Sequence, residues 1–120
     1  MDLNNPVIQL CQAGTQAEFE GRQDAARAAY RQAWDMVQDD YDACVAAHYM
    51  ARLQADPSIA LYWNQVALDR AEAVGDDRVR SFYPSLYLNL GQSYEQVGNA
   101  FEAEKYYALA AALGYQHRPE

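Results

Sequence analysis

The clearest pattern of hydrophobic and polar positions in this chain runs from Leu90 to Gly114, LGQSYEQVGNAFEAEKYYALAAALG. Apolar and small residues recur there at spacings of three and four, which is typical of helices that bury one face. Gly98-Asn99 interrupts the pattern, so we predict two short helices that meet at a tight corner. Small residues let two helix backbones approach closely, and large aromatic residues fill the wider gaps.

The same pattern occurs again near the start of the chain. Five residues there stand at the same relative places as Gly91, Gly98, Ala103, Tyr107 and Ala110, namely Gly14, Gly21, Ala26, Tyr30 and Ala33. A weaker middle copy lies at an offset of 34 residues, where Ala60, Asn64 and Ala67 match Ala26, Tyr30 and Ala33, and where His48 takes the place of Gly14. The sequence therefore indicates three copies of one helical hairpin.

Local start and stop signals predict the bounds of the earlier helices. Asn and Asp residues that precede a hydrophobic run cap helix starts, and proline is favoured in the first turn. We expect helices over about Pro6–Phe19, Asp24–Gln38 and Tyr41–Leu53, and a fourth helix that begins at Pro57 after Asp56 and ends at Gly75.

The second and third copies are separated by extra residues. His48 and Gly91 are 43 residues apart rather than 34, and the additional stretch is Gly75–Tyr83, GDDRVRSFY. Asp76-Asp77 is a new helix start. We expect one elongated helix from about Asp77 to Val97, kinked by Pro84. The alternative is a loop through Ser81–Tyr83, with the helix starting at Pro84.

The spacing L-G-x-x-Y, then G, then A-x-x-x-Y-x-x-A resembles the tetratricopeptide repeat (TPR), a helix–turn–helix unit of 34 residues. The resemblance covers most of the chain, with repeats at about 7–40, 41–74 and 84–114, an insertion at 75–83 and a short polar tail at 115–120. It implies a single all-α domain of six helices in three antiparallel pairs, stacked as a short right-handed solenoid with an elongated fifth helix. We expect no capping helix after Gly114.

Proteins of that family commonly bind a peptide or a partner's helix in a concave groove lined by the first helix of each repeat. By register, the groove positions here are Ile8, Cys11, Gln12, Thr15, Glu18, Phe19, Asp42, Val45, Ala46, Tyr49, Arg52, Leu53, Ser85, Leu88, Asn89, Gln92, Glu95 and Gln96. The family's carboxylate clamp would correspond to Cys11, Thr15, Ala46, Ser85 and Asn89. None of these is basic, so the clamp does not carry over.

Composition narrows the class of partner. The chain has 120 residues, with a formal net charge of −8, and offers no basic stripe for nucleic acid or anionic membrane. It has no apolar run long enough to span a membrane and no signal-peptide pattern at MDLNNPVIQL, so we expect a cytoplasmic protein. The two cysteines form no disulfide framework.

Few residues suggest chemistry. Cys44 and His48 share a helix face at i, i+4, as metal ligands can, and Asp42 is a possible third group. No second such pair exists in the sequence, so we expect core packing rather than a metal site, no cofactor and no catalytic residues. The acidic cluster Asp39, Asp40 and Asp42 lacks the glycine and distal glutamate of a calcium loop and is interpreted as helix capping.

The leading hypothesis is a non-catalytic protein-interaction module. The predicted contact residues are Gln12, Thr15, Asp42, Tyr49, Arg52, Asn89 and Gln92. A second hypothesis is a self-assembling scaffold that homodimerises through an uncovered face of the last helix. The candidate residues for that face are Phe101, Tyr106, Leu109 and Leu113. A weaker alternative is a small metal protein that uses Cys44 and His48.

Overall fold

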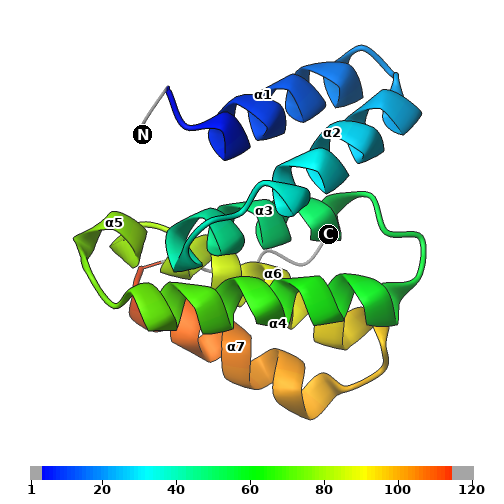
Figure 1. Ribbon diagram of the computed structural model, residues 1–120. Helices are drawn as coiled ribbons and strands as arrows, with labels where there is room; N and C mark the ends of the chain where they lie inside the picture. Colours follow the sequence, from blue (N-terminus) through cyan, green and yellow to red (C-terminus); the bar gives the residue numbers. More distant parts are fainter. Residues whose placement is uncertain (1–3, 115–120) are drawn as a thin grey trace.

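The structure is a computed structural model that describes residues 4–114, and within that range every regular element is a helix (Figure 1). The elements are α1 (Pro6–Phe19), α2 (Gln23–Asp35), α3 (Asp40–Arg52), α4 (Pro57–Val74), α5 (Asp77–Arg80), α6 (Tyr83–Gln96) and α7 (Ala100–Ala112). The all-α prediction is therefore confirmed for this range. The predicted tail, residues 115–120, lies outside the described residues.

Side-chain caps fix where the helices begin. Asn5, Asp39, Asp56, Asp76 and Asn99 each accept a backbone N–H from the first turn of the helix that follows. These bonds satisfy amide groups that have no partner inside the helix. The capping interpretation of Asp39 is thereby confirmed.

Consecutive long helices pack as hairpins, with α1 against α2, α3 against α4 and α6 against α7 (Figure 1). In the first hairpin the ring of Tyr30 lies on Gly14, and in the last the ring of Tyr107 lies on Gly91. Gly21 and Gly98, at the two corners, have positive φ angles of 79° and 84°, which glycine adopts without strain. The first and last copies of the sequence pattern therefore have the same local structure.

The hairpins also pack on one another. Helix α3 contacts both α1 and α2, while α6 contacts α4. The buried side chains form three clusters, and Trp34 packs against all of them. Its ring meets that of Trp63 edge-on, with the centroids 4.8 Å apart. One core thus extends from the first hairpin to the last.

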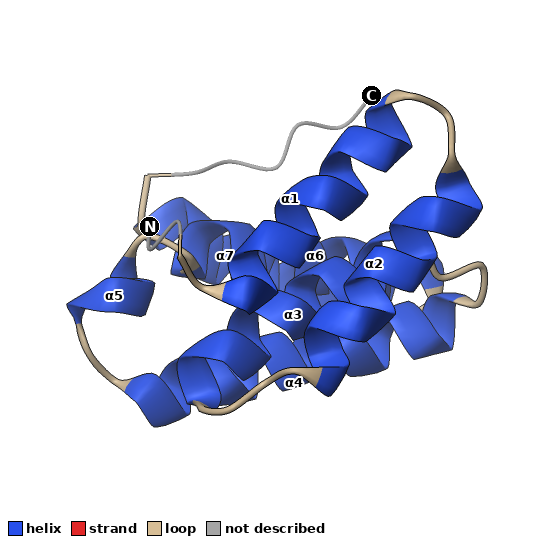
Figure 2. Ribbon diagram, turned by 45° about the horizontal axis from the view of Figure 1, so that its top comes forward, coloured by secondary structure: helices blue, strands red, loops and turns tan. Residues whose placement is uncertain are grey.

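The prediction of one elongated helix from Asp77 to Val97 is wrong, and so is the count of six helices. The short helix α5 ends at Arg80, Ser81 and Phe82 form a turn, and α6 begins at Tyr83, close to the alternative start at Pro84. Pro84 has no N–H to donate to the carbonyl of Arg80, and its ring would clash there. Figure 2 shows α5 set off from the long helices, beyond the end of α4.

The buried Val79 anchors α5 to the core, where it joins the cluster formed by α3, α4, α6 and α7.

The predicted bounds of α2 are also corrected, because that helix ends at Asp35 rather than near Gln38. Met36 and Val37 donate to carbonyls only three residues back, so the last turn is tightened. In the described part of the chain, no helix is both long and apolar enough to cross a membrane.

Candidate functional site

Two neighbouring cavities lie along α3 and α6 and share the side chain of His48. The first, called the apolar cavity, has a volume of about 170 Å³ and is lined by Cys44, Val45, His48, Tyr49, Ser81, Phe82, Ser85 and Leu86. The second, called the polar cavity, has a volume of about 350 Å³ and is lined by His48, Ala51, Arg52, Gln54, Ala60, Asn64, Asn89, Gln92, Ser93 and Gln96. Together they are called the α3–α6 cleft.

The cleft lies where the middle hairpin departs from the other two. At the places that hold Gly14 and Tyr30 in the first hairpin, the middle hairpin has His48 and Asn64. Both of these polar side chains bond to α6. Asn64 donates to the hydroxyl of Ser93 at 2.8 Å, and the ring of His48 meets the amide of Asn89 at 3.3 Å. Polar bridges to α6 therefore replace the glycine–tyrosine contact.

His48 is neutral at pH 7. Burial, and next the charge of Arg52, hold its pKa below the usual value. The side-chain nitrogen of Asn89 faces Nδ1 of the ring, and an amide nitrogen only donates, so Nδ1 accepts this bond. The proton of the neutral ring is then on Nε2. His48 thus presents an N–H donor in the wall that the two cavities share.

Arg52 does not present a free cation to the cleft. Its guanidinium bonds to Glu18 of α1, with Nη2 2.8 Å and Nε 3.1 Å from Oε2. The Glu18 side chain is only 14% exposed, so the pair is partly shielded from water. The polar cavity therefore combines one partly neutralised arginine with five uncharged amides, those of Gln54, Asn64, Asn89, Gln92 and Gln96.

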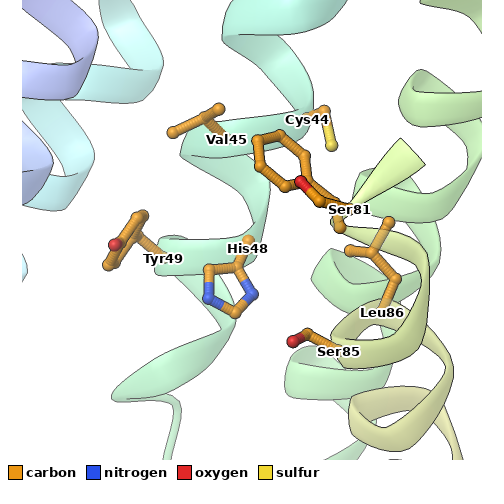
Figure 3. Close-up of a pocket in the computed structure, with 8 residues that line it drawn as sticks. Cys44, Val45, His48, Tyr49, Ser81, Ser85 and Leu86 are labelled. Carbon is orange, nitrogen blue, oxygen red and sulfur yellow. The ribbon is translucent and has the colours of Figure 1, made fainter. Parts of the chain in front are cut away.

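The apolar cavity joins three segments of the chain. Figure 3 shows His48 on α3 pointing toward Ser85 on α6, whereas Tyr49 points to the other side of α3, and Val45, Tyr49, Ser81 and Leu86 also border the cavity. Burial raises the pKa of the Cys44 thiol to about 11, so this group is an uncharged wall of the cavity at neutral pH.

The site does not bring metal ligands together. Within residues 4–114, no group of three or more histidine, cysteine, aspartate or glutamate side chains could hold a metal ion. Asp42, the possible third group beside Cys44 and His48, instead accepts bonds from Asn5 and from the backbone N–H of Gln38.

Four of the seven predicted contact residues line the α3–α6 cleft. Tyr49 borders the apolar cavity, while Arg52, Asn89 and Gln92 border the polar cavity. Gln12 and Thr15 lie exposed on α1, outside both linings, and the Thr15 hydroxyl donates to the carbonyl of Cys11. Asp42 is buried and serves the structural bonds described above. Of the predicted set, four residues thus line the cleft, two lie on α1 outside its linings, and Asp42 is buried.

The predicted dimer face needs one correction. Phe101, Leu109 and Leu113 are exposed, Phe101 by 81%, but Tyr106 is only 8% exposed. Its ring stacks on Tyr94 with the planes at 6°, and it belongs to the central core cluster. Tyr106 therefore points into the core and is not part of this surface.

Several cleft residues were not among the predicted contacts. His48 and Asn64 matched core places of the repeat, and their polarity was the available signal that these places differ. Ser81 and Phe82 fell inside an expected continuous helix, so only the length of the insertion hinted at an additional surface. No protein-family model matches the chain, and no curated protein or solved structure is significantly similar to it.

Proposed function

We propose that the chain is a TPR-like helical-repeat module that binds an extended peptide in the α3–α6 cleft, without catalysis. The observation that carries the proposal is the set of uncharged hydrogen-bonding groups that line the polar cavity. An extended peptide exposes unpaired backbone N–H and C=O groups, and amide side chains can both donate to and accept from them. A bound helix has already paired its backbone groups and needs an apolar stripe instead.

Stacking of the three hairpins as a solenoid is part of this proposal. It is supported by the matching Gly14–Tyr30 and Gly91–Tyr107 contacts, and by the packing of α3 on the first hairpin and of α6 on the second. Helical-repeat proteins commonly use one long face of the stack for binding. Here the polar bridges of His48 and Asn64 to α6 adapt that face to hydrogen bonding.

The charge of the cleft limits the peptide. Glu18 partly neutralises Arg52, which is the one charged side chain among the described residues that line the polar cavity. A strongly acidic peptide would therefore gain little there, and it would be repelled by the net charge of −8. The proposal is for a peptide segment that is neutral where it meets the cleft.

The test is selection of twelve-residue peptides from a random display library, followed by calorimetric affinity measurement. Gln92→Ala removes an exposed amide at the polar cavity. We expect this change to lower the affinity for a selected peptide about tenfold, because the loss of one hydrogen bond worth roughly 1.4 kcal/mol changes an affinity by that factor. Gln32→Ala, at an exposed site on α2, is the matched control. Equal affinities for the wild type and the Gln92→Ala variant would overturn the proposal.

A second candidate function is self-assembly. It is favoured by exposed apolar residues of α7, Phe101 and Leu109, and by Leu113 directly after that helix. Such a patch is a common basis for a symmetric dimer. The two functions are compatible, because the α7 residues do not line either cavity of the cleft.

A further inference from the structure

The inserted segment Gly75–Tyr83 supplies one wall of the apolar cavity through Ser81 and Phe82. No corresponding residues occur between the first and second copies of the repeat, which follow each other without an insertion. The placement of the inserted residues is fixed by the core, because Val79 is buried and Phe82 packs against two of the buried clusters. The ring of Phe82 also lies 6.0 Å from that of Tyr41, centroid to centroid. The insertion therefore shapes a rigid wall.

The volume of the apolar cavity fits one large apolar side chain. Its 170 Å³ compares with an engineered cavity of about 150 Å³ that binds benzene. No charged side chain lines it, and the thiol of Cys44 is protonated at neutral pH. Its polar groups are the hydroxyls of Ser81 and Ser85 and the rings of His48 and Tyr49. A charged ligand side chain would lose its hydration there without gaining an opposite charge.

We propose that the apolar cavity takes one uncharged apolar side chain, between leucine and phenylalanine in size, from the peptide bound in the α3–α6 cleft. This inference rests on the proposed function. His48, which both cavities share, would mark the boundary between the apolar anchor and the segment bound through its backbone. The ligand class is therefore an extended peptide with a single hydrophobic anchor beside a neutral polar segment.

The spacing of the two cavities sets the position of the anchor in the peptide. Ser85 of the apolar cavity and Asn89 of the polar cavity are four residues apart on α6, about one helical turn or roughly 6 Å. An extended chain advances about 3.3 Å per residue. The anchor consequently lies about two residues from the peptide group that meets Asn89.

The first experiment uses blocked amino acids, which carry one side chain and two peptide groups. N-acetyl-leucine amide and N-acetyl-alanine amide are titrated into the full chain, and the backbone amide resonances of Val45, His48 and Ser85 are followed by NMR. We expect saturable shifts with the leucine compound and at least about tenfold weaker binding of the alanine compound. Equal binding of both compounds would overturn the inference.

Ser85→Phe tests whether the shifts arise from occupation of this cavity. Ser85 is exposed at the rim, so a phenylalanine there would fill the space while the helix is retained. We expect this variant to lose the leucine-dependent shifts. Val45→Ala is a second variant that enlarges the cavity, and it should move the preference from leucine toward the larger N-acetyl-phenylalanine amide. Unchanged selectivity in both folded variants would overturn the inference.

Gln92→Ala separates this inference from the proposed function. The variant leaves the lining of the apolar cavity intact, so leucine-amide binding should stay the same while a selected peptide binds more weakly. A peptide that responds to Gln92→Ala but not to Ser85→Phe would overturn the anchor inference alone. If N-acetyl-leucine amide binds but Gln92→Ala does not change the affinity for a selected peptide, the proposed function is overturned. The assignment of the anchor to a peptide is then overturned as well.

Discussion

The ring of Tyr30 lies directly against the backbone of Gly14, with no room between them for a side chain. A Cβ atom added at Gly14 would lie 2.7 Å from Cδ1 of Tyr30, and one added at Gly91 would lie 2.5 Å from Cε1 of Tyr107. Such distances are well below ordinary van der Waals contact. The two glycines therefore set how closely α1 approaches α2, and how closely α6 approaches α7.

Gly14→Ala and Gly91→Ala should each destabilise the chain by about 1–3 kcal/mol, because the added methyl group overpacks the contact with a tyrosine ring. This cost opposes the roughly 0.5–1 kcal/mol that alanine normally gains over glycine inside a helix. Urea unfolding followed by circular dichroism measures the difference. Adding Tyr30→Leu to Gly14→Ala should recover part of the loss. A stabilised Gly14→Ala variant would mean that the two helices are further apart than described.

The ion pair between Arg52 and Glu18 joins α3 to α1. We expect Arg52→Ala to lower the free energy of unfolding by about 0.5–1 kcal/mol, which is the upper part of the range for partly exposed pairs, since two nitrogens contact one carboxylate. A double-mutant cycle with Glu18→Ala should give a coupling of similar size that shrinks in high salt. Arg31→Ala is the control, because its pair with Asp35 lies within α2 at 3.6 Å. Additive effects of the two substitutions would show that the pair contributes nothing.

The buried ring of His48 should make stability depend on pH. Its pKa is lowered in the folded chain, chiefly by burial and also by Arg52, so the unfolded chain binds a proton more readily. The contribution of His48 to the free energy of unfolding is fully present above the pKa of about 6.5 in the unfolded chain. This contribution is lost as the pH falls toward the pKa in the folded chain, and it changes no further below that pKa.

The measurement compares the free energy of unfolding of the wild type with that of His48→Gln between pH 5 and pH 8. The wild type should lose stability relative to the variant as the pH falls below about 6.5, since the carboxylates and the other histidine are common to both chains. Parallel pH profiles would exclude the buried neutral ring as the cause.

The apolar face of α7 predicts the state of association. If Phe101, Leu109 and Leu113 form a self-interface, light scattering should give twice the mass of one chain, and this mass should persist over a hundredfold dilution. The double substitution Leu109→Glu with Leu113→Glu should then give a monomer. Phe19→Glu is the control, because Phe19 is 90% exposed on α1, in a different hairpin. A wild-type monomer at every concentration would rule out this dimer.

Most helix starts could be predicted from the sequence because capping is local. Asn5 with Pro6, and Asp56 with Pro57, bring the cap and the first helical residue together within a few positions, and the structure has both starts. The recurrence of a glycine and a tyrosine at the same separation in the first and last hairpins was visible in the sequence, and the structure packs each tyrosine ring on its glycine. Repetition supplied the long-range information that a single copy lacks.

The sequence left two interpretations of the segment before α6, and the structure agrees with the alternative, a turn before a helix that begins near Pro84. The apolar cavity could not be predicted. Ser81 and Phe82 have helix-compatible dihedral angles, and what separates α5 from α6 is Pro84 together with the anchoring of Val79 in a distant core cluster. The side that each aromatic residue faces is equally non-local. Tyr106 turns into the core because Tyr94 offers a stacking partner there. The spacing of residues along the sequence does not show which distant side chains will pack together.

The position of Trp34 against all three buried clusters bears on how the chain melts. Arrays of helical hairpins make mainly nearest-neighbour contacts, and their ends can fray independently of the centre. Here one indole ring is a packing partner of every cluster, so loosening any of them removes contacts from the same side chain. We therefore expect the first hairpin and the last to unfold in a single cooperative transition, and the combined fluorescence of Trp34 and Trp63, whose rings are in contact, to follow that transition.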